Sequence, residues 1–319
     1  MRLKPIIFFA LILALGCNPK QEIQQVGTFH AENDRFWEVI PRDARAEIIG
    51  IDFQFTEGPA WHPDGSLLFT DIPANTIYRW NGKKYVEFRK PTNQANGLLI
   101  EPDGSVLACE HGSRSVTRYS AEGELTVIAD RYQGNRFNSP NDLCKASGGA
   151  LYFTDPPWGL PGKNDDPAKE IPFSGVFRLY EGEVTLVDST LSWPNGIALS
   201  PDGRYLYVAN FEMNPGSGES GNEVFWMRYE LDESGEAMDK EVFFRAPDPS
   251  LPGGPDGMKV DRSGNLFLTG PGGILVVDPA GVHLGTIGIP VPATNLALGP
   301  REKTLIITAR TEIVRVGLK

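Results

Sequence analysis

The sequence predicts an all-β protein, a six-bladed β-propeller, from three observations. Six repeats along the chain each begin with an oxygen-bearing residue, continue through a turn such as Pro-Asp-Gly and then enter an apolar strand. The repeats begin 39 to 61 residues apart, and propeller blades of four short strands are commonly about 40–45 residues long. Finally, the sequence lacks the apolar periodicity that is typical of amphipathic helices.

The first residue of each repeat occupies what we call the inner-ring position. The six residues at this position are Glu57, Asn96, Asn141, Asn195, Asp256 and Asn295. The apolar strands that follow them cover residues 67–70, 106–109, 151–154, 205–209, 266–269 and 305–308. In every repeat, the inner-ring residue precedes the residue directly after this strand by 14 or 15 positions. A spacing that is held six times predicts that the six residues surround one axis.

Each repeat is predicted to contain four antiparallel strands. In the second repeat these strands cover residues 97–100, 105–109, 115–119 and 124–129, with tight polar turns between them. The last repeat has room for only three strands before the chain ends at Lys319. We expect the apolar segment 46–51 to supply its fourth strand, which closes the ring and removes an exposed sheet edge.

Residues 1–17 are predicted to be a lipoprotein-type signal peptide. A basic start precedes an apolar run, residues 6–15, that is too short to span a bilayer. The run leads to Cys17 in a pattern that resembles a bacterial lipoprotein signal, in which Cys17 is lipidated, although Ala14 and Leu15 are swapped relative to the usual order. Soluble export and an uncleaved anchor are the alternatives. The expected location is the cell envelope, either lipid-anchored or otherwise outside the cytoplasm.

After this signal, residues 18–40 are predicted to form a polar tether and residues 41–319 the propeller. The 319 residues carry a net charge of −11, which argues against nucleic acid and anionic membrane surfaces as partners. Contact with a membrane is therefore expected only through the lipid anchor. Cys109 and Cys144 are predicted to be buried free thiols, with a disulfide between them as the alternative.

The strand order places the candidate site at one end of the propeller. In an antiparallel meander, the start of the first strand and the end of the second lie at the same end of a blade. Two of the loops that follow second strands are long, at residues 155–174 and 210–222, and long loops over a rigid scaffold often carry binding residues. The second strands are followed by several polar residues that we expect to form an outer ring: Asp71, Glu110, Asp155 and Asn210. For Asp71 and Asp155, a role in turn formation is the alternative.

A ring of carboxylates and carboxamides is the kind of ligand set that binds a hard cation. Glu57 and Asp256 would supply two negative charges that match a divalent ion, and Asn carbonyl oxygens would supply neutral ligands. The alternative is that Asn and Asp only shape the turn at this position. That alternative explains Glu57 poorly, and it leaves two carboxylates facing a narrow channel without a compensating charge.

Five stretches of the chain carry a more specific resemblance: residues 57–61, 109–112, 138–142, 153–159 and 255–258. Through them, residues 46 to 317 resemble the senescence-marker-protein/gluconolactonase (regucalcin-like) family, and its bacterial gluconolactonases in particular. The resemblance implies a divalent cation, usually Ca²⁺, with ligands at Glu57, Asn195 and Asp256. It also implies that Asn141 contacts the substrate or metal-bound water. The animal members place a substrate-binding Arg where this chain has Ser139, and the nearest Arg is Arg136.

The expected function is therefore the metal-dependent hydrolysis of a sugar lactone to the aldonic acid. Asp256 is the expected general base, and the expected substrate-binding residues are Asn96, Glu110, His111, Arg136, Asn141 and Trp158. The expected metal ligands are Glu57, Asn141, Asn195 and Asp256. Oxygen ligands favour Ca²⁺, with Zn²⁺, Mn²⁺ or Mg²⁺ as alternatives. Two other functions stay open, namely a related calcium-propeller esterase and a non-catalytic surface propeller that binds calcium or glycans. His111 could also be a site base or a polar turn residue, and Trp158 could be a loop anchor.

Overall fold

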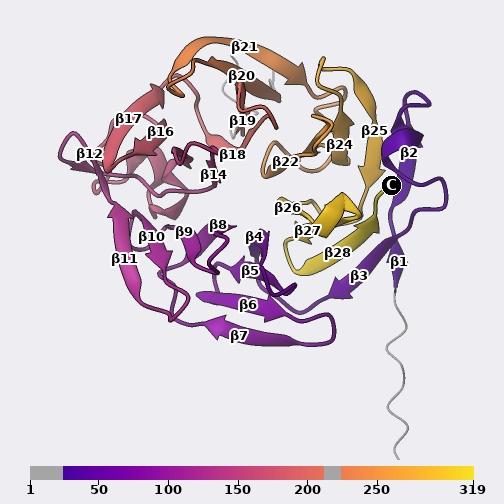
Figure 1. The fold of residues 1–319 in the computed structure, drawn as a ribbon, viewed down its shortest axis with the longest axis horizontal. Helices are drawn as coiled ribbons and strands as arrows, with labels where there is room; N and C mark the ends of the chain where they lie inside the picture. The colour runs from indigo at the N-terminus through magenta and orange to yellow at the C-terminus, as the bar shows by residue number, and fades with distance from the viewer. Residues whose placement is uncertain (1–23, 212–223) are drawn as a thin grey trace, which may run out of the picture.

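Six antiparallel sheets surround a central axis, as Figure 1 shows in a computed structural model that describes residues 24–211 and 224–319. Four of these sheets have four strands, and the other two each gain a fifth strand from the N-terminal part of the chain. The prediction of a six-bladed β-propeller is therefore confirmed. Each blade runs outward from the axis in sequence order, because neighbouring strands are joined by short turns. The first strand of each blade lies nearest the axis, and this arrangement brings the inner-ring positions together.

The blades are formed as follows. Blade 1 contains β4 Thr56–Trp61, β5 Leu67–Asp71, β6 Thr76–Trp80 and β7 Tyr85–Arg89. Blade 2 contains β8 Ala95–Ile100, β9 Val106–Glu110, β10 Ser115–Tyr119 and β11 Leu125–Ala129. Blade 3 contains β14 Leu143–Lys145, β15 Leu151–Asp155, β16 Gly175–Tyr180 and β17 Glu183–Asp188. Blade 4 contains β18 Pro194–Leu199, β19 Tyr205–Asn210, β20 Phe225–Leu231 and β21 Ala237–Arg245. Blade 5 contains β22 Met258–Val260, β23 Leu266–Gly270, β24 Gly273–Val277 and β25 His283–Gly288. A small hairpin, β12 Arg131–Tyr132 and β13 Asn135–Arg136, leads from blade 2 to blade 3.

The ring is closed by a strand from the N-terminal part of the chain. Blade 6 consists of β26 Asn295–Leu298, β27 Thr304–Ala309, β28 Glu312–Gly317 and β3 Ala46–Gly50. Strand β3 pairs antiparallel with β28, with Ile48 opposite Val314, so the prediction that segment 46–51 completes the last blade is confirmed. The two strands lie side by side in Figure 1 although they are more than 260 residues apart in the sequence.

The expected tether differs from the structure wherever the structure describes it. Within residues 24–40, β1 Gln25–Val26 pairs with β3, β2 Thr28–Ala31 pairs with β25, and the short helix α1 Phe36–Val39 follows. Phe36 and Ile40 are fully buried in the core between blades 5 and 6. The polar composition of this segment concealed these apolar anchors and the two short pairing strands. Cys17 and residues 18–23 lie outside the described residues.

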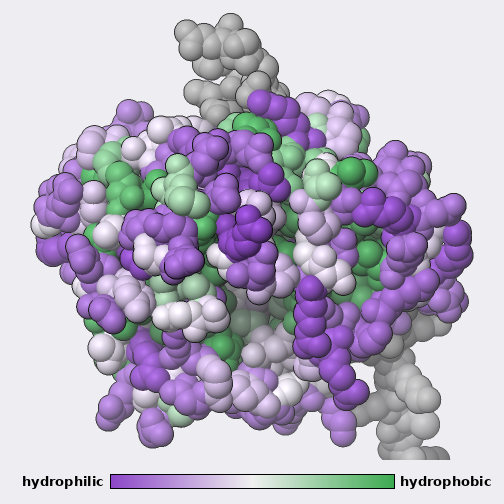
Figure 2. All heavy atoms as spheres, turned by 45° about the horizontal axis from the view of Figure 1, so that its top comes forward, coloured by the Kyte–Doolittle hydropathy of each residue, from purple (hydrophilic) through white to green (hydrophobic). Residues whose placement is uncertain are grey.

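Apolar side chains of neighbouring blades pack against each other and form the cores. Cys109 is fully buried between blades 2 and 3, and Cys144 is partly buried; both are free thiols, as predicted. On the face seen in Figure 2, hydrophilic residues predominate and hydrophobic ones show in separate areas. Among the described residues, no helix has the length and apolar character needed to cross a membrane.

Candidate active site

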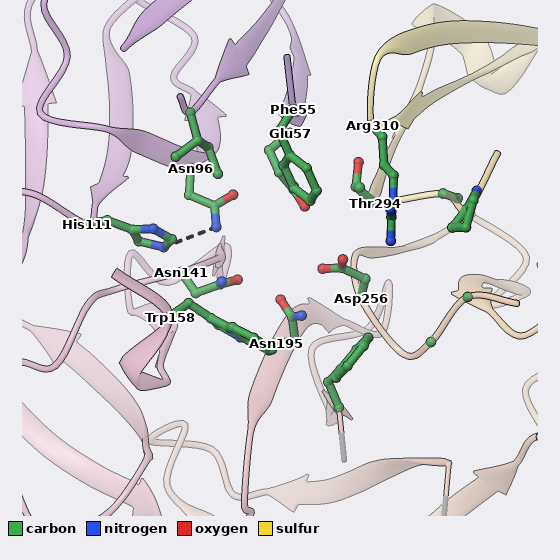
Figure 3. Close-up of a pocket in the computed structure, with 16 residues that line it drawn as sticks. Phe55, Glu57, Asn96, His111, Asn141, Trp158, Asn195, Asp256, Thr294 and Arg310 are labelled. Carbon is green, nitrogen blue, oxygen red and sulfur yellow. Dashed lines mark hydrogen bonds between the residues drawn. The ribbon is translucent and has the colours of Figure 1, made fainter. Parts of the chain in front are cut away.

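A cavity of about 380 Å³ opens at one end of the central channel. Five inner-ring residues, one from each of blades 1 to 5, line this cavity and point toward one another in Figure 3: Glu57, Asn96, Asn141, Asn195 and Asp256. The structure thus brings together all four residues that the sequence suggested as metal ligands. They converge because each lies at the inner start of its blade.

The sixth inner-ring residue is Thr294 rather than Asn295. A repeated hydrogen bond between blades defines the position: the backbone amide after one inner-ring residue donates to the carbonyl oxygen of the next inner-ring residue. Gly196 donates to Asp256 in this way over 3.1 Å, and Gly257 donates to Thr294 over 2.7 Å. Thr294 also lines the cavity. The predicted inner-ring residue of the last repeat was therefore wrong by one position.

The close approach of the inner strands explains why glycine follows many inner-ring residues. A Cβ atom at Gly196 would lie 2.1 Å from the Asp256 carbonyl oxygen, and one at Gly257 would lie 2.1 Å from Asn295 Oδ1. Neither distance is sterically possible, so these positions require glycine. In blades 3 and 6, Asp142 and Asn295 occupy the same position, and their side chains fill the channel next to the inner ring.

Asn295 and Asp142 form a support for Glu57. Asn295 Nδ2 donates to Glu57 Oε2 at 3.0 Å and to Asp142 Oδ2 at 3.2 Å. The Gly58 amide donates to the same Glu57 oxygen at 3.0 Å. No hydrogen bond from residues 24–211 or 224–319 reaches Glu57 Oε1. One oxygen of this carboxylate is therefore fixed in place, and the other is available to a ligand.

The carboxyl groups in and next to the cavity have raised pKa values. Burial raises the pKa of Glu57 to about 7, and the nearby Asp142 adds to this effect. Burial, followed by repulsion from Glu57, raises the pKa of Asp256 well above its usual range. Burial likewise raises the pKa of Asp142. Across the described part of the chain, none of the three forms an ion pair with Lys or Arg. A cation at the centre of the ring would relieve this repulsion.

The donor set fits a divalent cation. The described residues contain no group of three or more His, Cys, Asp and Glu side chains suited to an ion. The inner ring instead offers two carboxylates with amide oxygens from Asn141 and Asn195, all hard oxygen donors of the type that Ca²⁺ prefers. Glu57 and Asp256 together would balance two positive charges.

One wall of the cavity is aromatic. Trp158, in the short helix η1 Pro157–Gly159, lies with its ring centroid 4.4 Å from Trp193 and 5.7 Å from Phe211. Lys163 also donates to the Trp158 carbonyl oxygen. Trp158 both lines the cavity and anchors its loop, so the two roles proposed for it are compatible.

His111 lies beside the inner ring. Its Nε2 is 3.2 Å from Asn96 Nδ2, and both residues line the cavity, as Figure 3 shows. Burial lowers the pKa of His111 to about 4, with a further contribution from Lys163. The imidazole is therefore neutral near pH 7, and it serves as a hydrogen-bonding group rather than as a cation.

The predicted outer ring was wrong by one residue. The polar residues that end the second strands do not line the cavity. Three of them accept hydrogen bonds from the loops that lead into the inner ring. Asp71 accepts the amides of Gln54 and Phe55 at 2.9 and 3.1 Å, and Asp155 accepts those of Asn138 and Ser139, both at 2.7 Å. Asn210 accepts the Trp193 amide at 3.0 Å. The turn interpretation of Asp71 and Asp155 thus describes their contacts.

The next residue of the chain lines the cavity instead. In four blades this position contributes a side chain to the wall: Ile72, His111, Phe211 and Arg310. Successive side chains of a strand point in opposite directions, so an error of one residue exchanges the inside and the outside. Counting one residue further in each repeat would have identified Arg310, which the sequence interpretation missed together with Thr294 and Asp142.

The structure does not bring Glu110 or Arg136 to the cavity. Glu110 is fully buried inside blade 2, where it accepts hydrogen bonds from Asn93, Ser113, Thr117 and Tyr119. Arg136 donates to the Ser113 carbonyl oxygen at 2.8 Å. These partners satisfy a buried carboxylate and hold a guanidinium, so neither residue is a substrate ligand in this arrangement.

Comparison with known proteins identifies the family of this chain. The family described as SMP-30/gluconolactonase/LRE-like region matches residues 55–311. A gluconolactonase of Zymomonas mobilis is 39% identical over 296 residues, which are 86% of this chain and 81% of that protein. A pentonolactonase of Haloferax volcanii is 28% identical over 272 residues, 82% of this chain and 83% of its own length.

A solved gluconolactonase structure from Xanthomonas campestris superposes with a TM-score of 0.81 at 30% identity, covering 93% of this chain and 98% of that one. The family match spans all six inner-ring residues, including the four that are the candidate metal ligands. The chain therefore belongs to the SMP-30/gluconolactonase/LRE-like family.

Proposed function

We propose that the protein is a lactonase that hydrolyses a sugar lactone to the aldonic acid with the help of a divalent cation. Glu57, Asn141, Asn195 and Asp256 would hold the cation, for which we favour Ca²⁺ over Zn²⁺, Mn²⁺ or Mg²⁺. The observation that carries the proposal is the convergence in one cavity of two amides and two carboxylates, neither of which forms an ion pair with Lys or Arg in residues 24–211 and 224–319. The lactonase names of the relatives support the reaction class.

When bound, the cation would polarise the lactone carbonyl group and stabilise negative charge on its oxygen. Asp256 would act as general base and remove a proton from the attacking water. The water oxygen then bonds to the carbonyl carbon, the bond from that carbon to the ring oxygen breaks, and the ring oxygen takes up a proton. Asp256 can do this only with an oxygen that does not ligate the cation, because a coordinated carboxylate oxygen is a weak base.

The other walls are suited to a sugar ring. Asn96, His111 and Asn141 present amide and imidazole groups that can bond to hydroxyl groups. Trp158 presents an aromatic surface against which the C–H face of a sugar can pack.

A second candidate is an esterase that acts on aryl or phosphate esters. It is favoured by a specific observation: the cavity also has an apolar portion formed by Phe55, Ile72, Phe211 and Ala293. A larger apolar substrate could occupy this portion. The lactonase remains the preferred function because the reacting groups lie among polar side chains and because the relatives are named for lactones.

The test is the Asp256→Asn variant, assayed with a panel of aldonolactones and aryl esters. Asn keeps the size and one oxygen of the side chain, so the fold should persist. Loss of a positioned base typically lowers the rate about 10²–10⁴-fold. The lactone rate should stay low at saturating Ca²⁺. Near-normal turnover at saturating Ca²⁺ would make Asp256 a ligand only, and normal turnover without added metal would refute the site. Wild-type protein that binds the ion but hydrolyses nothing would indicate a binding propeller.

We also propose that the protein is held in the cell envelope by a lipid on Cys17. The support is the sequence pattern alone, because Cys17 lies outside the described residues. Mass spectrometry of the native protein should show a lipidated N-terminal Cys17. An intact Met1 or an unmodified Cys17 would contradict the proposal.

A further inference from the structure

Arg310 occupies an unusual place in the cavity. It follows β27 and lines the wall opposite Asn96 and His111, with its guanidinium toward Asp256 in Figure 3. Its backbone has φ of 52°, in the left-handed region that glycine adopts most easily. The amide and Oγ1 of Thr56 hold its carbonyl oxygen at 2.7 and 2.8 Å.

The guanidinium group of Arg310 has no partner in the described part of the chain. No hydrogen bond or ion pair joins it to residues 24–211 or 224–319, although its charge is felt by Asp256. Arg114 shows the contrast, because its guanidinium donates to the carbonyl oxygens of Phe137, Ala168 and Arg136. The donors of Arg310 are therefore free to bind a ligand within the cavity.

The charges of the site favour an anion once a divalent cation is present. Glu57 and Asp256 balance the two charges of the cation, and His111 is neutral near pH 7. Asp142 and Lys259 lie outside the inner ring and carry opposite charges. Arg310 then adds a positive charge that nothing in the ring offsets, and Lys163 at the aromatic wall adds to it.

We infer that Arg310 binds the carboxylate that forms when the lactone opens, an inference that rests on the proposed function. The lactone is neutral. Hydrolysis joins the water oxygen to the carbonyl carbon, breaks the bond to the ring oxygen, leaves a hydroxyl group there and releases one proton, so the product is an aldonate anion. The planar guanidinium matches the two oxygens of a carboxylate. Arg310 thus contributes more to the developing anion than to the bound lactone.

The inference is tested with Arg310→Gln and Arg310→Lys in protein loaded with Ca²⁺. Calorimetry should show that Arg310→Gln binds the aldonate roughly 10- to 100-fold more weakly, the loss expected for one charged hydrogen bond. Binding of the matching uncharged sugar alcohol should not change. Arg310→Lys should recover part of the aldonate affinity. For the lactone, kcat should fall more than KM rises.

Arg301→Gln is the matched control, since Arg301 also has a left-handed backbone, with φ of 59°, and does not line the cavity. It should bind the aldonate as the wild type does. Three results would overturn the inference: equal aldonate affinity in wild type and Arg310→Gln, equal losses of affinity for the aldonate and the sugar alcohol in Arg310→Gln, or no aldonate binding by the wild type. So would an effect confined to lactones that already carry a carboxylate, because Arg310 would then recognise a substituent. Absence of lactone turnover in the wild type, with Arg310-dependent aldonate binding intact, would refute the proposed function alone.

Discussion

When the cation has been removed, raising the pH should lower the free energy of unfolding, because Glu57 must then ionise inside the cavity. Its pKa is about 7 in the folded protein, compared with 4.5 for an ordinary Glu. The folded state therefore holds the proton more tightly than the unfolded state does. The resulting stabilisation is complete below pH 4.5 and is lost as the pH rises through 7. At about 1.36 kcal/mol per pH unit, the loss is about 3 kcal/mol.

The assay is urea denaturation of chelated protein at a series of pH values from 4 to 8, repeated with Ca²⁺. In the chelated protein the free energy of unfolding should decrease across this range, and the raised pKa of Asp256 acts in the same direction. Bound Ca²⁺ replaces the proton as the compensating charge, so the decrease should disappear when Ca²⁺ is present. Because other groups titrate in this range, Glu57→Gln is the control that isolates Glu57.

Glu57→Gln keeps an oxygen that can accept from Asn295 but has no charge to lose. Its chelated form should show a smaller decrease between pH 4.5 and 7 than the chelated wild type, by about 3 kcal/mol. Identical pH dependence in the two proteins would refute the assignment of Glu57 as a strained carboxylate. A wild-type decrease that Ca²⁺ leaves unchanged would refute its role as a cation ligand.

Two further predictions concern the support of the ring. Asn295→Ala should weaken Ca²⁺ binding about 10–100-fold in calorimetry, the usual effect of removing a hydrogen-bond partner from a metal ligand; unchanged affinity would show that Asn295 does not position Glu57. Gly196→Ala should lower the free energy of unfolding by about 1–3 kcal/mol or more, because the new Cβ would meet the Asp256 carbonyl oxygen at 2.1 Å. Gly148→Ala, where nothing lies within 4 Å, is its control and should change stability by less than about 0.5 kcal/mol.

The features that sequence reasoning identified share one property, a dependence on repetition. The number of blades and the closing strand at 46–50 follow from strand spacing and from the missing fourth strand of the last repeat. The convergence of Glu57, Asn141, Asn195 and Asp256 follows from their equivalent places in different blades. Errors within single repeats do not affect these conclusions, because six repeats constrain one another.

The features that it missed depend on single residues and on contacts between blades. Thr294 was confused with Asn295 because a shift of one residue left the spacing within the range of the other repeats. Glu110 lies inside its blade while the following His111 reaches the cavity, a difference set by the alternation of the strand. Phe36 and Ile40 anchor a segment whose average composition is that of a tether. The spacing of the repeats does not by itself fix which of two adjacent residues faces the cavity, and it does not reveal isolated buried residues outside the repeats.

The central claim is that one divalent cation, held by the inner ring, is required for lactone hydrolysis. The most direct measurement titrates Ca²⁺ into chelated protein while the rate of aldonolactone hydrolysis and the heat of binding are followed on the same sample. We predict that turnover is lost on chelation and returns in proportion to the binding of one ion per chain, and that Glu57→Gln shifts both curves to higher Ca²⁺ concentration together. Full turnover in the chelated protein, or Ca²⁺ binding that Glu57→Gln leaves unchanged, would contradict the claim.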